Sequence, residues 1–285
     1  MKRLVLFLVL ITATAAELKL PMKDKSVRFA VIGDNGTGLP PQFEVAKEMI
    51  KDHGSFPFDF VIMMGDNIYG SQRPDDYKRK FEEPYQPLLD AGVKFYASLG
   101  NHDDPNQRLY KPFNMDGKRY YSFTKGNVEF FALDSNYMDA AQLDWLKKAL
   151  SGSKATWKIC YFHHPMYSHG SDHGADVDMR KEVEPLFLEN HVNVVISGHE
   201  HSYERLKPQK GIAYFVLGNS GQLRPHNLKP SSETEKGFDT DQGFGLVEVT
   251  GNDMYFQVIS RTGQTVDYVV LHADSSNLSS VEPSR

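Results

Sequence analysis

Short apolar runs alternate with amphipathic stretches along the first two hundred residues of the chain. Glycine or histidine follows each of these runs, a pattern typical of buried strands that end in loops. Between several runs the apolar residues recur every three to four positions, which predicts helices. The predicted strands are 27–32, 58–64, 93–99, 156–162 and 192–197, and the predicted helices are 42–53, 75–91, 140–150 and 179–190.

The pattern changes after about residue 211, where only strands are predicted, at 212–217, 244–249, 254–261 and 266–271. A hairpin is predicted earlier, from 119–124 and 128–134. The polar segment 227–242 has no clear period and is expected to be a surface loop. Pro84 and Pro87 are expected to interrupt the helix that contains them. Strands that alternate with helices and then run antiparallel predict an α/β fold, with mixed sheets flanked by helices.

Composition and the lack of a linker predict how the chain is divided into domains. The chain has 285 residues, of which 40% are hydrophobic and 24% are charged, both ordinary values for a globular protein. We find no linker-like segment and no repeat, so we expect one catalytic domain over residues 17–272. The Ser-rich residues 273–285 are expected to form a flexible tail.

The first sixteen residues have the layout of a secretory signal peptide. A basic start, Met1-Lys2-Arg3, precedes an apolar run over 4–11 and small residues up to Ala16. We therefore expect an exported protein, periplasmic or extracellular. No other segment approaches the roughly 20 apolar residues of a membrane span, so none is expected in the mature protein.

Charge and cysteine content restrict the partners and the compartment. Removing residues 1–16 leaves 30 basic against 37 acidic residues, a net charge of −7, which argues against a nucleic-acid backbone as a partner. Cys160 is the only cysteine, so no intrachain disulfide can form. An exported protein without disulfides suits a bacterial periplasm better than a eukaryotic extracellular space.

Five polar loops directly follow five predicted strands. They are Gly33-Asp34-Asn35-Gly36, Gly65-Asp66-Asn67-Ile68-Tyr69, Gly100-Asn101-His102-Asp103, His163-His164-Pro165 and Gly198-His199-Glu200-His201. In α/β sheets such loops gather at the carboxyl ends of the strands. Carboxylate, amide and imidazole groups without cysteine suit iron, manganese or zinc in a reactive site rather than a structural zinc. The loops therefore predict a site for two ions, with Asp66 able to bridge them.

The ordered blocks DNG, GDNIY, GNHD, HHP and GHEH resemble the five blocks of the calcineurin-like metallophosphoesterases. Two details are similar to the purple acid phosphatases of that superfamily. Gly36 stands where most members carry a metal-binding histidine, and Tyr69 stands where purple acid phosphatases carry a metal-bound tyrosine. The run from Gly198 to Arg205 also looks like that family's last block. The resemblance implies a four-layer α/β/β/α sandwich in the short form, with the catalytic domain alone.

The resemblance also implies two metal-binding sets. Fe(III) would be held by Asp34, Asp66, Tyr69 and His201, and a divalent iron, zinc or manganese ion by Asp66, Asn101, His163 and His199. The phenolate of Tyr69 is a hard anionic donor, which favours the ferric ion.

Two further histidines are implied to act on the substrate. His102 would point toward the phosphate and steady the transition state or protonate the leaving oxygen. We assign the second role to His173, which lies one residue further along the chain than the family spacing, with His169 as the alternative. His164 is expected to turn away from the ions.

The expected activity is hydrolysis of a small phosphate monoester at an Fe(III)–M(II) centre, by attack of a metal-bound hydroxide, with an acidic optimum. A phosphodiesterase or nucleotidase on the same metal centre is the alternative, because variable segments 70–87, 104–118 and 223–241 would shape the substrate pocket. A third hypothesis is an inactive module that recognises phosphorylated ligands. The presence of all seven metal-binding positions and His102 argues against it.

Overall fold

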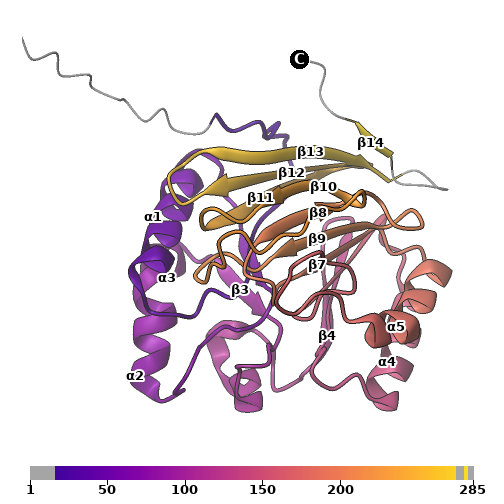
Figure 1. Cartoon of the computed structure of the whole chain (residues 1–285), viewed down its shortest axis with the longest axis horizontal. Coiled ribbons are helices and arrows are strands. Elements are labelled where there is room, and N and C mark those ends of the chain that lie inside the picture. Colours follow the sequence, from indigo (N-terminus) through magenta and orange to yellow (C-terminus); the bar gives the residue numbers. More distant parts are fainter. Residues whose placement is uncertain (1–16, 274–278, 282–285) are drawn as a thin grey trace, which may run out of the picture.

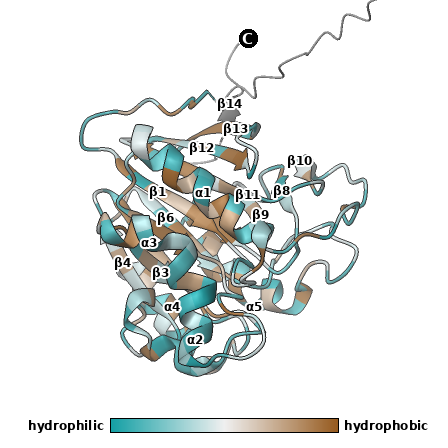
Figure 2. Ribbon diagram, turned by 90° about the vertical axis from the view of Figure 1, so that its left-hand side faces the viewer, coloured by the Kyte–Doolittle hydropathy of each residue, from teal (hydrophilic) through white to brown (hydrophobic). Residues whose placement is uncertain are grey.

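Two facing sheets form the centre of the molecule, and helices cover their outer faces (Figure 1). The computed structural model describes residues 17–273 and 279–281, so the predicted signal peptide lies outside the described residues. The result is the predicted α/β/β/α sandwich. Figure 2 shows hydrophobic strands in the interior and helices with hydrophilic outer faces.

The first sheet has the strand order β14-β13-β12-β11-β1-β2-β3. Its strands are β1 (Val27–Ile32), β2 (Phe60–Met63), β3 (Lys94–Ala97), β11 (Gly243–Thr250), β12 (Asp253–Ser260), β13 (Thr265–His272) and β14 (Ser279–Val281). β1, β2 and β3 are parallel, and β11 joins β1 antiparallel. β14 pairs with β13 inside the segment that the sequence assigned to a tail.

The second sheet has the order β10-β8-β9-β7-β6-β5-β4. Its strands are β4 (Tyr121–Lys125), β5 (Val128–Ala132), β6 (Trp157–Phe162), β7 (Val194–Ser197), β8 (Tyr203–Leu206), β9 (Ala213–Leu217) and β10 (Thr234–Phe238). β5, β6, β7 and β9 run parallel. The predicted hairpin is confirmed as β4 and β5.

The expectation of a surface loop over 227–242 is wrong for β10, which pairs antiparallel with β8 at the sheet edge. Three of the five β10 residues are exposed, because an edge strand need not bury one face. It therefore lacks the alternation that marks other strands. β8 was also missed, because all four of its residues are buried and two of them are charged.

Helices lie on both sides of the sandwich. They are α1 (Pro40–Ser55), α2 (Pro74–Tyr77), α3 (Glu83–Asp90), α4 (Ala140–Gly152) and α5 (Val177–Glu189). Short 3₁₀ turns occur at η2 (Pro105–Leu109) and η3 (Lys111–Phe113). No helix among the described residues is both long enough and apolar enough to cross a bilayer.

Pro84 and Pro87 do not interrupt the helical region, contrary to expectation. A π-helical turn, η1 (Lys78–Glu82), joins α2 to α3, and Pro84 falls in the first turn of α3. Pro87 lies inside α3, and the helical backbone nevertheless continues to Asp90. The chain therefore continues from residue 74 to residue 90 without leaving helical conformations.

Aromatic side chains fill the space between the two sheets. The Phe29 ring of β1 lies 5.1 Å from Phe130 of β5, edge to face, and Phe215 of β9 stacks on Phe256 of β12 at 4.4 Å. Such pairs contribute about 0.5–1.5 kcal/mol each beyond their buried area. A second apolar cluster packs the outer face of the second sheet against α4 and α5. The core fixes the two sheets together and aligns the carboxyl ends of their parallel strands.

Candidate metal centre

Three of the predicted metal-binding residues hold an unusual backbone conformation. Asp34, Asp66 and His199 have φ angles of 54°, 52° and 70°. Non-glycine residues rarely adopt positive φ, and such strain gathers at functional sites where the surrounding structure enforces it. A Cβ at Gly100 would lie 2.2 Å from Asp66 Oδ1, and one at Gly198 would lie 2.4 Å from Asp34 Oδ2. Glycine at these two positions lets the carboxylates reach the edge of the sheets.

One group of candidate ligand atoms gathers around Asp34. The Tyr69 hydroxyl donates to Asp34 Oδ1 at 3.1 Å and lies 3.2 Å from His201 Nε2. His201 Nε2 is 3.4 Å from Asp34 Oδ1. Carboxylate oxygens of Asp34 and Asp66 lie within 4.8 Å of the His201 ring nitrogen and of each other. These four residues are the set predicted to hold Fe(III).

A second group gathers around His163, which is completely buried. Its Nε2 lies 2.9 Å from Asn101 Oδ1, 3.0 Å from His199 Nδ1 and 3.5 Å from Asp66 Oδ1. Asp66 therefore belongs to both groups. These four residues are the set predicted to hold the divalent ion.

The donor atoms of the second group fit a cation. His163 Nδ1 donates to the Met64 carbonyl oxygen at 2.8 Å, which fixes the tautomer and leaves a lone pair on Nε2. Burial, with His164 as a further cause, holds the pKa of His163 well below its usual range, so the ring is neutral. Its lone pair faces the lone pairs of Asn101 Oδ1 and Asp66 Oδ1. A positive ion bound between these atoms would offset the repulsion between their lone pairs.

The electrostatics of the first group also fit a cation. Burial and the neighbouring Asp66 carboxylate raise the pKa of Asp34 well above its usual value. Burial and the same two carboxylates raise the pKa of the Tyr69 hydroxyl. Burial and Arg224 lower the pKa of His201 to about 4, so this imidazole is neutral and able to bind a metal at pH 7. A metal ion here would offset the repulsion between the two carboxylates.

His164 lies closer to the centre than the sequence led us to expect. Its ring is 4.5 Å from that of His199, and its ligand atom groups with those of His163 and His199 within 4.8 Å. His164 Nδ1 forms a 2.9 Å hydrogen bond with Ser135 Oγ. Its side chain does not turn away from the site, and it completes a cluster of three imidazoles.

The two histidines expected to act on substrate both border the candidate centre. The exposed His102 ring lies 4.9 Å from the Tyr69 ring, and its backbone N–H donates to Asp66 Oδ1 at 3.0 Å. His173 is exposed and stacks on His199 at 4.1 Å. His169 is the alternative, and its Nδ1 forms a 2.8 Å hydrogen bond with Glu204 Oε1. Of the two alternatives, His173 is the one whose ring contacts a predicted metal-binding residue.

Asp103 joins two of the site loops, a role that the sequence did not reveal. Its carboxylate accepts hydrogen bonds from the backbone N–H groups of Gly100, Asn67 and Ile68 and from the side chains of Asn67 and Gln107. Burial, with Asp66 as a second cause, raises its pKa to about 7. The available signal was its place at the end of the GNHD block. Asp103 fixes the Asn101 loop against the loop that carries Asp66.

Glu200 likewise fixes a loop by hydrogen bonds, in this case the loop that carries His173. It is fully buried between His199 and His201. Its Oε1 accepts from the backbone N–H groups of His173 at 2.8 Å and Gly174 at 2.5 Å. Its Oε2 accepts from Asn227 Nδ2 at 2.6 Å. A buried carboxylate thus ties the loop that bears His173 to the strand end that bears two predicted metal-binding histidines.

Arg224 brings a positive charge to the same place, and the sequence did not single it out. Its charge acts on both His201 and Asp34. Its Nε pairs with Asp172 at 2.7 Å, while Nη1 is buried without a hydrogen-bond partner among the described residues. A buried N–H group with no acceptor is costly, so this one is a candidate for binding an anion at the site.

Comparison with known proteins identifies the family of the chain. Residues 27–203 match the calcineurin-like phosphoesterase family. Purple acid phosphatase 17 of Arabidopsis thaliana is 28% identical and covers 81% of this chain and 80% of its own length. Human tartrate-resistant acid phosphatase type 5 is 24% identical, with 85% of this chain and 89% of the human protein covered.

Solved structures share the fold. Purple acid phosphatase PPD1 from yellow lupin matches with a TM-score of 0.71 at 18% identity, over 86% of this chain and 53% of the lupin chain. GAP50 of Plasmodium matches with a TM-score of 0.74 at 20% identity, over 89% of both chains. The predicted resemblance to purple acid phosphatases is confirmed, and candidate ligands for a metal site are present. The chain therefore belongs to the calcineurin-like phosphoesterase family, a family of metal-dependent hydrolases of phosphate esters.

Proposed function

We propose that the protein is an acid phosphatase that hydrolyses phosphate monoesters at a two-metal centre. Asp34, Asp66, Tyr69 and His201 would hold Fe(III), and Asp66, Asn101, His163 and His199 would hold divalent iron, zinc or manganese. One observation carries the proposal: two groups of candidate ligand atoms meet at the Asp66 carboxylate, and the Tyr69 hydroxyl belongs to one of them. The similarity to purple acid phosphatases supports the same conclusion.

Two bound ions would supply the charge that polarises the ester phosphate and lowers the pKa of a water molecule. The protein residues prepare the site for this. The tautomer of His163 presents a lone pair to the centre, and burial keeps the imidazoles neutral at working pH. The same burial removes bulk water from the carboxylates, which strengthens their interaction with a cation.

Three groups at the rim would bind the substrate. His102 is exposed next to Tyr69 of the first group of candidate ligands. His173 is exposed next to His199 of the second group. An imidazolium at either position can donate a proton to the leaving oxygen. The buried Nη1 of Arg224 offers a charged donor to a phosphate oxygen. We infer that His102 and His173 orient and protonate the ester while Arg224 binds its phosphate.

Two other functions are compatible with the same site. A phosphodiesterase or nucleotidase would use the same ions. An inactive binding module remains an alternative because fold does not determine function: GAP50, which has the same fold, is described as the anchor in the inner membrane complex of Plasmodium. The presence of every predicted metal-binding side chain supports an enzyme. We also propose, from the sequence of residues 1–16, that the protein is exported.

Parallel assays of the metal-loaded protein with p-nitrophenyl phosphate and bis-p-nitrophenyl phosphate test this proposal. We expect faster turnover of the monoester, an acidic optimum, loss of activity on chelation and recovery with added iron and zinc. Faster turnover of the diester would favour the phosphodiesterase. Absence of turnover in a protein that retains both ions would favour the binding module.

A further inference from the structure

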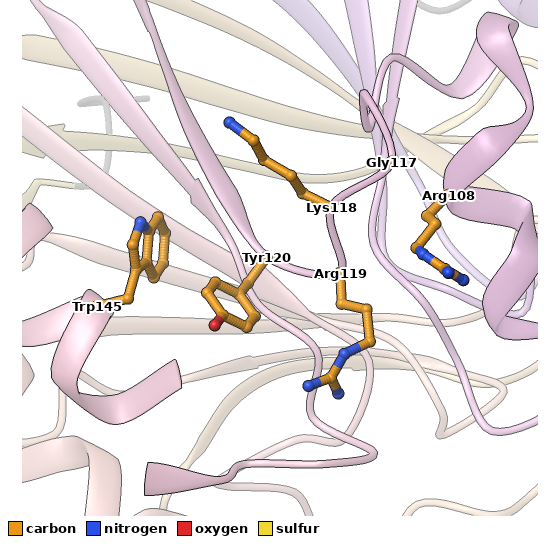
Figure 3. A pocket seen from close by; sticks show the side chains of 6 residues that line it. All are labelled: Arg108, Gly117, Lys118, Arg119, Tyr120 and Trp145. Carbon is orange, nitrogen blue, oxygen red and sulfur yellow. The ribbon is translucent and has the colours of Figure 1, made fainter. Parts of the chain in front are cut away.

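Most basic side chains of the chain are at least partly exposed, and Lys80 is an exception. Around the pocket of about 580 Å³ in Figure 3, the charged ends of Arg108, Lys118 and Arg119 point to separate places and do not converge on one group. Lys80 is the only buried lysine among the described residues, with 5% of its surface exposed. Burying an ammonium group is costly unless protein oxygens replace its water. The oxygens around Lys80 Nζ therefore indicate what this charge does.

Three oxygens surround the ammonium group of Lys80. Its Nζ donates to the carbonyl oxygen of Tyr69 at 2.6 Å and to that of Ser71 at 3.1 Å, and it pairs with Asp76 Oδ1 at 3.1 Å. An ammonium group has three N–H donors, so these three acceptors satisfy it. Two of the acceptors lie in the loop after β2, on either side of Gly70. The buried charge of Lys80 thus fixes the backbone of the loop that carries Tyr69.

Tyr69 is held by both of its backbone polar groups. Its N–H donates to the Gly36 carbonyl oxygen at 2.9 Å, and its carbonyl oxygen accepts from Lys80. Gly70, the next residue, has a φ of 69°, which glycine adopts without strain. Between the two fixed groups, the Tyr69 side chain extends its hydroxyl to Asp34 Oδ1. Lys80 and Gly36 together determine where this hydroxyl lies.

The π-helical turn η1 (Lys78–Glu82) fixes the position of Lys80. Pro84 has no N–H group to offer the Lys80 carbonyl oxygen, and this oxygen accepts from Gln42 Nε2 at 2.6 Å. Gln42 Oε1 in turn accepts from the Gly38 backbone N–H at 2.7 Å. The Lys80 side chain passes directly beside Gly38, where a Cβ would lie 3.0 Å from Lys80 Cγ. Short π-helical turns are frequent at functional sites, and this one connects the chain segments that follow β1 and β2.

We propose that Lys80 is a positioning residue for Tyr69, which it holds in place to bind the ferric ion. The inference rests on the proposed function, since it needs Tyr69 to bind iron. Lys80 acts through the Tyr69 carbonyl oxygen and touches neither metal nor substrate. Without its hydrogen bonds, the loop after β2 loses the contacts that keep the Tyr69 hydroxyl beside Asp34.

The visible absorption band of the iron-loaded protein tests the proposal, because it reports the contact between Tyr69 and iron. Lys80→Met keeps the apolar stem and removes the donors. We expect a weaker or shifted band and roughly tenfold weaker iron binding, as is typical when a group that orients a metal ligand is replaced. Lys80→Arg should retain the band, because a guanidinium can donate to the same carbonyl oxygens. Lys78→Met replaces an exposed lysine of the same π-helical turn and should behave like the wild type.

Circular dichroism and thermal melting show which variants are folded. If Lys80→Met does not fold, Lys80→Gln takes its place in the same comparison. An unchanged band with unchanged iron affinity in the folded Lys80 variant would overturn the proposal and leave the proposed function intact. An equal loss in Lys78→Met would also overturn it, because the position of Lys80 would then not be the cause. A wild-type protein that shows no band with iron bound would overturn both the proposal and the assignment of Tyr69 as an iron ligand.

Discussion

Tyr69 donates its backbone N–H to the Gly36 carbonyl oxygen at 2.9 Å, joining the loop after β2 to the loop after β1. A Cβ at Gly36 would lie 1.8 Å from the Asn67 carbonyl oxygen, so no side chain fits there with this backbone. Gly36 and Tyr69, the two departures from the wider superfamily pattern, are therefore structurally linked. Absence of a side chain at Gly36 allows the close approach of the loop that brings the Tyr69 hydroxyl to Asp34.

Tyr69→Phe should abolish visible absorption in the iron-loaded protein while leaving the fold intact. The substitution removes the phenolate donor but keeps the ring and its contact with His102. An absorption spectrum with circular dichroism measures both effects. An unchanged visible band in the variant, or no such band in the wild type with iron bound, would show that Tyr69 is not an iron ligand.

Arg224→Gln should raise KM for a phosphate monoester roughly tenfold or more, because a charge-assisted hydrogen bond is lost. The metal content should stay the same, since guanidinium does not bind metal ions. Steady-state kinetics and elemental analysis of the same sample make the measurement. Arg180→Gln, which removes a guanidinium stacked 4.3 Å from the Tyr167 ring, is a control with an equal change of charge. If KM is unchanged in Arg224→Gln, the group does not bind substrate.

Glu200→Gln should lower kcat and shift the pH profile, because the loop that carries His173 loses charged acceptors for two backbone N–H groups. His173→Asn should lower kcat in a similar way. His169→Asn is the matched control: its Nδ1 binds Glu204, so its loss should leave the pH profile unchanged. A pH profile altered by His169→Asn and not by His173→Asn would reverse the assignment.

Asp52→Asn should stabilise the protein at neutral pH. Burial, with Glu48 as a second cause, raises the pKa of Asp52 to about 6, and its Oδ2 has no hydrogen-bond partner among the described residues. A raised carboxyl pKa means that the folded state holds the proton more tightly, so stability is lost as pH rises from about 4 to about 6. The neutral amide avoids this loss, and we expect a gain of about 1–3 kcal/mol at pH 7.

Denaturant unfolding of Asp52→Asn at two pH values checks the sign. The gain should be present at pH 7 and should largely disappear near pH 3, where the wild-type carboxyl is mostly protonated in both the folded and the unfolded state. An equal gain at both pH values would mean that the charge is not the cause.

The sequence predicted the strands that position the site, because each has a continuous apolar run followed by glycine or histidine. It could not predict β10, whose exposed edge position removes the hydrophobic pattern. It placed the candidate ligands correctly on strand ends, since parallel strands bring those ends together. It did not reveal the parts played by Asp103 and Glu200, because their partners are backbone N–H groups of distant loops. Residue identity does not specify such contacts.

Metal analysis of the purified protein and of Asp66→Asn tests the central claim most directly. The account predicts two ions per chain in the wild type, one of them iron, and loss of metal from both groups in the variant, because the Asp66 carboxylate belongs to both. Asp52→Asn, an equivalent change outside the site, should retain two ions. A wild-type protein that binds a single ion at saturating iron and zinc, or an Asp66→Asn variant that keeps two, would contradict it.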